Sequence, residues 1–353
     1  MRAILSNSKL TVVLDQLEDA IDPVAEEELH RQWTRFTFED SGAVFIAGRG
    51  KKAEIDIAPP PLVNETLEFT DDGLANMLTA QYTACLRCLK SGSGALLTVR
   101  GSYGVGILPS VFGCEPFLMA REQDCLPNVR PLGGSAIPAL LDRGGPDVRR
   151  GYGERVFAVG ELFLEIAERY PQIGTHVHPI HPDLQGPFDV AELLWGSDLF
   201  YALYDQPETV HALLDLICGA YSAFMEKWQT LFPAGEYAYH WGNMHRGALM
   251  LRDDSAMNLP PELCREFILP YDNRLLARLG GGAVHFCGRG DHYIELLSGM
   301  ERLYAVALSQ PECNDMETIY RHTVDKGIRL LNLRMDVLLR DRERLGGMAC
   351  GIG

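Results

Sequence analysis

The sequence predicts an α/β protein: a (β/α)8 TIM barrel that follows an N-terminal, mostly helical extension. From residue 95 onward, short apolar runs alternate with longer amphipathic helical patterns, as in a parallel sheet with crossover helices. These runs number seven or eight, which favours a closed barrel over an open doubly wound sheet. The glycines of residues 101–106 miss the dinucleotide-binding spacing, so no nucleotide loop supports the open sheet.

The chain divides into an extension at residues 1–92, predicted to cap the barrel, and the barrel itself at residues 93–353. The extension has helical patterns at residues 24–33 and 72–89 and a β-like run at residues 43–47, separated by turn and proline residues. The barrel strands are predicted at residues 95–100, 174–177, 236–241, 248–251, 283–287, 304–308 and 328–331. The helices between them are predicted at residues 153–170, 188–204, 207–232, 261–279, 292–300 and 315–326.

Composition excludes several classes of protein. The 353 residues are 46% hydrophobic and 23% charged, as in a soluble globular protein. A net charge of -16 disfavours nucleic acid and anionic membranes as partners. No signal segment and no run of about 18 apolar residues is evident, so we expect a cytoplasmic protein. Nine scattered cysteines fit reduced thiols, which remain able to bind metal.

Polar side chains follow the predicted strands, where the chemistry of a barrel gathers at the carboxyl ends. Each of them is also an ordinary loop residue, and only their convergence indicates one site. In chain order they are His176, His178, His181, Asp183, Gln185, His240, Trp241, Asn243, His245, Arg252, Asp253, Asp254, His285, Cys287, Arg289, Gln310, Glu312 and Asn314.

Residues 280–290 read GGGAVHFCGRG and carry the most specific of these patterns. Strand alternation puts His285 and Cys287 on the same face. An imidazole nitrogen and a thiolate suit zinc, which needs one more protein ligand for an open catalytic site. The alternative is a strand end with a buried cysteine and a hydrogen-bonded histidine.

Two cysteines are candidates for the third metal ligand. Cys350 lies among small residues after what we expect to be the final strand, so its sulfur can reach a neighbouring strand end. Cys313 also follows a strand, but Pro311 turns the chain away there, and Asn314 resembles a helix N-cap. The pattern favours Cys350, with Cys313 as the rival.

Three segments together give a resemblance to a known superfamily. They are residues 183–196 (DLQGPFDVAELLWG), residues 253–262 (DDSAMNLPPE) with 267–271 (FILPY), and residues 285–288 (HFCG). Over roughly residues 150–353 the chain resembles the superfamily that joins uroporphyrinogen decarboxylase to the zinc-dependent methyltransferases, which move methyl groups between corrinoid proteins and thiols such as coenzyme M. The resemblance implies a (β/α)8 barrel with a deep pocket and zinc bound by His285, Cys287 and Cys350.

The chain departs from that superfamily in two places. The arginine-bearing segment Pro-x-Trp-x-Met-Arg-Gln-Ala-Gly-Arg of the decarboxylases does not occur in residues 1–90, so decarboxylation of uroporphyrinogen is not expected. The final Cys-Gly also arrives earlier than in the methyltransferases.

The predicted function is zinc-dependent methyl transfer between a corrinoid, such as methylcobalamin, and a thiol or similar small acceptor. The corrinoid acts as donor or acceptor, in the pocket or on a partner corrinoid protein. The alternatives are a decarboxylase-like lyase acting on a tetrapyrrole or polycarboxylate, and a non-catalytic corrinoid or tetrapyrrole carrier. Residues predicted to orient the reacting groups are Asp253, Asp254, His240 and Gln310. Residues predicted to bind substrate are His178, Asp183, Gln185, His245, Arg289, Glu312 and Asn314.

Overall fold

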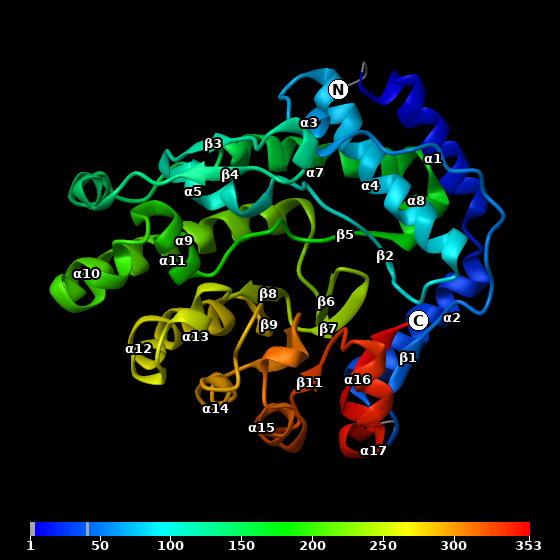
Figure 1. Ribbon diagram of the computed structural model, residues 1–353. Coiled ribbons are helices and arrows are strands. Elements are labelled where there is room, and N and C mark those ends of the chain that lie inside the picture. The colour runs from blue at the N-terminus through cyan, green and yellow to red at the C-terminus, as the bar shows by residue number, and fades with distance from the viewer. Residues whose placement is uncertain (1–3, 40–41) are drawn as a thin grey trace.

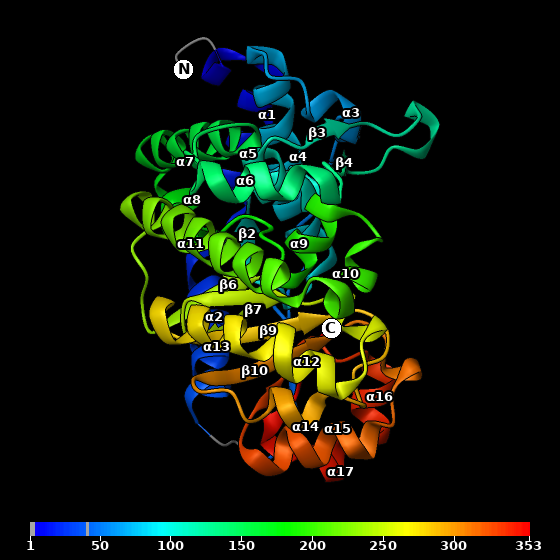
Figure 2. The same ribbon diagram turned by 90° about the vertical axis from the view of Figure 1, so that its left-hand side faces the viewer.

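The computed structural model describes residues 4–39 and 42–353. Helices form much of the outside of the molecule, strands β2, β5, β6, β7, β8 and β9 lie toward its middle, and β1 and β3 lie near its edges (Figure 1). Helices α11 and α13 lie side by side on one face (Figure 2). Within the described ranges, no helix combines the length and the apolar character that a membrane crossing requires.

Each predicted helical pattern contains an α-helix, and two of the patterns are divided in two, whereas α1, α3, α5, α6, α8, α16 and α17 were not predicted. The predicted helix at 188–204 is interrupted at Gly196, whose φ of 87° suits glycine, and the one at 261–279 is interrupted at Ile268. The helices are α1 Ser8–Ala20, α2 Pro23–Phe38, α3 Val63–Thr66, α4 Asp71–Ser91, α5 Ile107–Phe112, α6 Ile137–Arg143, α7 Tyr152–Arg169, α8 Pro171–His176, α9 Pro187–Trp195, α10 Leu199–Asp205, α11 Pro207–Leu231, α12 Pro261–Phe267, α13 Leu269–Leu279, α14 Ile294–Leu297, α15 Met316–His322, α16 Met335–Arg340 and α17 Arg342–Leu345.

The strands are short. Residues 174–177, predicted as a strand, mostly belong to α8, and the strand begins only at Val177. The strands are β1 Phe45–Ala47, β2 Leu97–Val99, β3 Glu115–Phe117, β4 Asn128–Arg130, β5 Val177–Pro179, β6 Tyr237–His240, β7 Asn243–Arg246, β8 Leu249–Arg252, β9 Gly282–Phe286, β10 Leu303–Leu308, β11 Arg329–Leu330 and β12 Cys350–Ile352.

The predicted eight-stranded parallel barrel is wrong. Across the described residues, the strands form one four-stranded sheet, in the order β11-β10-β9-β8, and four separate two-stranded sheets. Neighbouring strands in the four-stranded sheet are parallel, as are β1 with β12 and β2 with β5. The β3–β4 and β6–β7 pairs are antiparallel. The protein is therefore a mixed α/β fold built on small sheets.

The β6–β7 hairpin explains one part of this difference. Trp241 and Gly242 connect its strands with φ values of 47° and 77°, as a type I′ turn requires at both central positions. The chain therefore reverses directly after His240 and pairs with itself. The sequence predicted one strand at residues 236–241 and the next at 248–251, so β7, which lies between them, was not predicted.

The predicted N-terminal extension is in contact with the rest of the chain. Strand β1 pairs in parallel with the C-terminal β12, so the C-terminus lies beside β1 (Figure 1). Leu29, Trp33 and Phe36 of α2 pack in one buried cluster with residues from β1, β7 and β12, among others. The Nε1 atom of Trp33 also donates a hydrogen bond of 3.0 Å to the carbonyl oxygen of Gly94. The proposed boundary near residue 92 stays a prediction.

Candidate metal centre

A cavity of about 650 Å³ opens at the ends of β6, β9, β10 and β11. Its volume falls in the range of small-molecule sites in proteins, roughly 300–1,000 Å³. Its wall combines an apolar majority with a few polar groups, as such sites do. The lining residues are His240, Trp241, Asn243, Met250, His285, Ala307, Leu308, Ser309, Leu331, Asn332, Leu333, Arg334, Met335 and Ile352.

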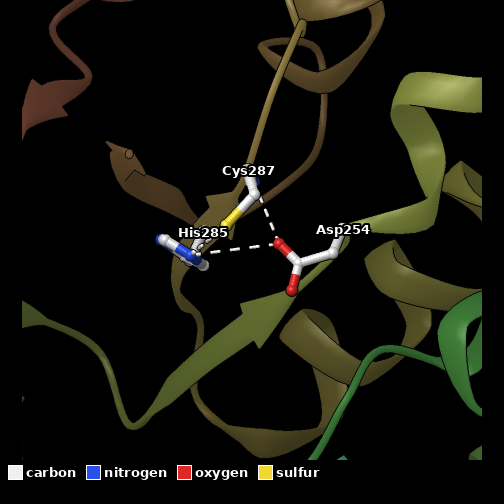
Figure 3. Close-up of side chains that lie close together, drawn as sticks. All are labelled: Asp254, His285 and Cys287. Atoms are coloured by element: carbon white, nitrogen blue, oxygen red, sulfur yellow. Dashed lines mark hydrogen bonds and ion pairs between the residues drawn. The ribbon is translucent and has the colours of Figure 1, made fainter. Parts of the chain in front are cut away.

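Three candidate metal donors meet at the edge of this cavity (Figure 3). The Nε2 atom of His285, in β9, lies 3.5 Å from Sγ of Cys287 and 4.0 Å from Oδ1 of Asp254. Within the described residues, this is the one group of three histidine, cysteine or carboxylate side chains whose donor atoms all lie within 4.8 Å of one another. The alternation that predicted a common face for His285 and Cys287 agrees with this arrangement.

The main chain holds Asp254 in place just after β8. Its Oδ1 accepts a 2.9 Å hydrogen bond from the amide of Cys287, which links the ends of β8 and β9. The buried carboxylate of Asp189 accepts 2.8 Å hydrogen bonds from the amides of Asp254 and Ser255. Asp189 lies in the first turn of α9, so that helix fixes the path of the chain through Asp254. It was not among the predicted site residues, although it lies in the segment 183–196.

The spacing of the nitrogen and sulfur donors fits zinc. Zn–N and Zn–S bonds of about 2.0 and 2.3 Å at a tetrahedral angle put nitrogen and sulfur about 3.5 Å apart. The observed Nε2–Sγ distance is the same, 3.5 Å. Asp254 is an oxygen donor, and zinc accepts nitrogen, sulfur and carboxylate oxygen together. His285, Cys287 and Asp254 are thus a chemically suitable three-residue set, one short of the four ligands of a tetrahedral shell.

Burial sets the charge of these groups in the absence of a cation. Burial raises the pKa of the Cys287 thiol to about 11, although its hydrogen bond with the Ser309 hydroxyl lowers it. Burial lowers the pKa of His285, against the opposing effect of Asp254. The imidazole is therefore neutral at pH 7 and able to donate its Nε2 lone pair, whereas the thiol needs a cation to lose its proton.

The two cysteines predicted to compete for the third position lie elsewhere. Cys350 is fully buried in β12, where its Sγ lies 3.4 Å from the amide nitrogen of Asn332 and 3.8 Å from Oδ1 of Asn243. Cys313 is exposed on the loop after β10. Neither sulfur belongs to the three-donor group, in which the third candidate donor is Asp254, and the prediction of Cys350 as a ligand stays a prediction.

A buried ion network lies beside the metal centre. Asp183 pairs with Arg252 at 2.6 Å and with Arg100 at 3.0 Å. Gln185, also predicted to bind substrate, donates to Asp183 at 3.2 Å. The two guanidinium groups, despite the cost of burial, keep the pKa of Asp183 below its ordinary value. Asp183 and Gln185 are therefore engaged with protein groups and do not line the cavity.

The predicted histidines separate into two sets. His240 and His245 are buried and hydrogen-bonded to each other at 3.0 Å, and His240 lines the cavity. His178 instead stacks on Tyr239, with ring centroids 4.0 Å apart, and lies near His30. It is not one of the cavity residues.

The remaining predicted residues shape the loops around the centre. The side-chain oxygen of Gln310 accepts from the amide of Gly288, next to Cys287. Asn314 binds the same loop, accepting from the amide of Gly290 at 2.7 Å and donating to the Gly288 carbonyl at 3.0 Å. The other two form ion pairs: Arg289 with Asp291 at 2.6 Å and Glu312 with Arg334 at 3.0 Å.

Asp253 faces away from the cavity. Its amide donates to the His285 carbonyl at 2.9 Å, but its carboxyl group is buried against Asp272. Burial raises the pKa of both acids, and that of Asp272 reaches about 7. A shared proton between the two groups accounts for their close approach.

Trp241, a strand-end residue to which the sequence assigned no specific role, lies against the candidate centre. Its indole ring stands edge-on to the ring of His285, with centroids 4.7 Å apart. The guanidinium carbon of Arg252 lies 5.2 Å from the centroid of the same ring. An aromatic residue at φ 47° is strained, and such strain concentrates at functional sites. The sequence signal for this turn was the Trp-Gly pair between two short β runs.

Comparison with known proteins gives a structural similarity. No protein-family profile matches the chain, and no curated protein matches its sequence. A methyltransferase from Methanosarcina mazei is similar in structure, with a TM-score of 0.58 and 14% sequence identity over 91% of this chain and 91% of that chain. At this identity the likeness shows a shared fold alone, and the superfamily resemblance stays a prediction.

Proposed function

We propose that the protein is a zinc-dependent methyltransferase that moves a methyl group between a corrinoid and a thiol or similar small acceptor. The observation that carries the proposal is the set of nitrogen, sulfur and oxygen donors of His285, Cys287 and Asp254 at the edge of a cavity of about 650 Å³. The fold shared with a methyltransferase supports it.

The residues of the candidate centre would have the following roles in this reaction. His285, Cys287 and Asp254 hold the metal, and the amide of Cys287 together with Asp189 keeps Asp254 in position. Zinc supplies Lewis-acid activation, since it lowers the pKa of a thiol at its open position. The ring of Trp241, edge-on to the His285 imidazole with centroids 4.7 Å apart, would help to hold the orientation of that imidazole.

A decarboxylase-like lyase is less well supported. Recognition of a polycarboxylate calls for guanidinium groups that are free to form bidentate pairs with the substrate. Arg252 and Arg100 near the site are both paired with Asp183. Arg334, in the cavity wall, is paired with Glu312 and Asp336.

In the proposed methyl transfer, the corrinoid would arrive free or on a partner corrinoid protein.

The test combines metal content with methyl transfer. Zinc-loaded protein is mixed with methylcobalamin and 2-mercaptoethanol; cobalamin absorbance and mass spectrometry of the methylated thiol are followed. We expect transfer by the wild type and none by His285→Ala. Binding of the corrinoid without any methylated thiol would instead favour the carrier. A protein that neither holds zinc nor methylates the thiol would refute the proposal.

A further inference from the structure

Hydrogen bonds in the wall of the cavity fix which nitrogen of His240 carries a proton. The chain of bonds begins at His245, whose Nδ1 lies 3.0 Å from the carbonyl oxygen of Arg246. A carbonyl only accepts, so this Nδ1 carries a hydrogen. Burial lowers the pKa of His245 to about 4, so its ring is neutral and its Nε2 has no hydrogen.

The next ring in the chain is His240. Its Nδ1 lies 3.0 Å from the Nε2 of His245, which can only accept, so the hydrogen of His240 sits on Nδ1. Burial also lowers the pKa of His240 well below its ordinary value. The ring is therefore neutral, and its Nε2 bears a lone pair and no proton.

No protein group satisfies that lone pair. The neighbouring ring of His181, with its centroid 4.2 Å away, is fully engaged: its Nδ1 donates to Pro182 at 2.8 Å and its Nε2 accepts from the amide of Met250 at 3.0 Å. Within residues 4–39 and 42–353, the Nε2 of His240 has no hydrogen-bond partner. His240 is only 1% exposed, yet it is part of the cavity wall.

We infer that the Nε2 of His240 is the acceptor for an uncharged hydrogen-bond donor, such as a hydroxyl or amide group, on the small ligand of this cavity. A buried acceptor without a donor is costly, so a ligand that supplies one is favoured over a ligand of the same shape that does not. A carboxylate at the same place would bring its own lone pairs against that of Nε2 and is rejected. Because the inference assigns the thiol end of the ligand to the metal centre, it rests on the proposed function.

The ring state is tested first, and without any activity. Long-range ¹H–¹⁵N correlation spectra of ¹⁵N-histidine-labelled zinc-loaded protein at pH 7 report which nitrogen of each ring is protonated. His240→Gln identifies the His240 signals. We expect a neutral ring with hydrogen on Nδ1 and a bare Nε2. A hydrogen on Nε2, or a charged ring, would overturn the inference.

The need for a hydrogen-bond donor on the ligand is tested with pairs of thiols that differ in one group. Each of 2-mercaptoethanol, 3-mercapto-1-propanol and 4-mercapto-1-butanol is compared with the alkanethiol that has a methyl group in place of the hydroxyl. At least one hydroxythiol should shift the Nε2 resonance of His240 upfield, whereas its alkanethiol should not. The affinity of that hydroxythiol should exceed its partner's by about tenfold. His240→Leu should remove the difference, and His240→Gln, which retains an acceptor, should keep part of it.

The outcomes separate the two proposals. An Nε2 shift with the hydroxythiols but no methyl transfer would keep the acceptor role and refute the methyltransferase. Methyl transfer with equal affinities within every pair and an unmoved Nε2 signal would refute the acceptor role and leave the methyltransferase standing.

Discussion

The Nε2 atom of His285 and the Sγ atom of Cys287 lie 3.5 Å apart at the carboxyl end of β9. Alternation along a strand predicted that both side chains share a face, and the strand supplies that geometry. The third donor, Asp254, comes from the neighbouring β8 end, where Arg252 is in register with His285. Two adjacent parallel strand ends thus bring all three donors together.

Removal of either donor on β9 should abolish zinc binding. His285→Ala and Cys287→Ser each leave two donors, and we expect a loss of affinity larger than the roughly 10–100-fold typical of outer-shell changes. Metal analysis after dialysis against a mild chelator measures it. The exposed Cys313 provides the control, since Cys313→Ser should retain the metal. Zinc that remains at wild-type stoichiometry in both β9 variants would contradict this site.

A second pair of variants tests whether the third metal donor is Asp254 or Cys350. Asp254→Asn replaces the carboxylate with a weaker neutral oxygen donor, so we expect zinc to be lost at a lower chelator concentration than in the wild type. Cys350→Ser should hold zinc as the wild type does, because its sulfur lies outside the three-donor group. The reverse result would restore Cys350, the ligand that the sequence pattern favoured.

The grouping of the three candidate donors could be predicted in part because its strongest signal is local. His285 lies in β9 and Cys287 directly follows the end of that strand, so one local segment determines how both side chains point. Asp254 was predicted as a catalytic group, but its proximity to them depends on the pairing of β8 with β9. Pairing between segments far apart in the sequence is not encoded in the periodicity of either one, so the place of Asp254 in this group was not predicted.

The sheet was predicted less well, for a related reason. Periodicity located β8, β9 and β10 closely, because each is a buried apolar run. It did not reveal that Trp241 reverses the chain, since a turn with two positive φ values more often contains Asn-Gly or Asp-Gly. Counting apolar runs consequently gave a regular barrel in place of several small sheets.

The buried pairing of Asp183 should contribute strongly to stability. Asp183→Asn leaves the guanidinium groups of Arg252 and Arg100 without their counter-charge, and the Arg252 side chain is only 2% exposed. We expect the free energy of unfolding to fall by about 3–5 kcal/mol. Urea denaturation followed by circular dichroism measures this. Asp215→Asn breaks a pair with Arg274 whose side chains are about half exposed, and should cost less than about 1 kcal/mol. Equal losses in both variants would show that burial is not the cause.

Stability should depend on pH through the acid pair of Asp272 and Asp253. Burial raises the pKa of Asp272 to about 7 from an ordinary value of 3.8. The folded protein therefore keeps a proton that the unfolded chain loses above pH 3.8, so this contribution to stability is complete below that pH and declines as pH rises to about 7. Asp272→Asn removes the titrating group but can still donate a hydrogen bond to Asp253. Relative to this variant, the wild type should lose up to about 1.4 kcal/mol of unfolding free energy per pH unit between about pH 4 and 7. Urea titrations of both proteins at several pH values measure the difference, and parallel pH profiles would show that Asp272 does not hold the proton.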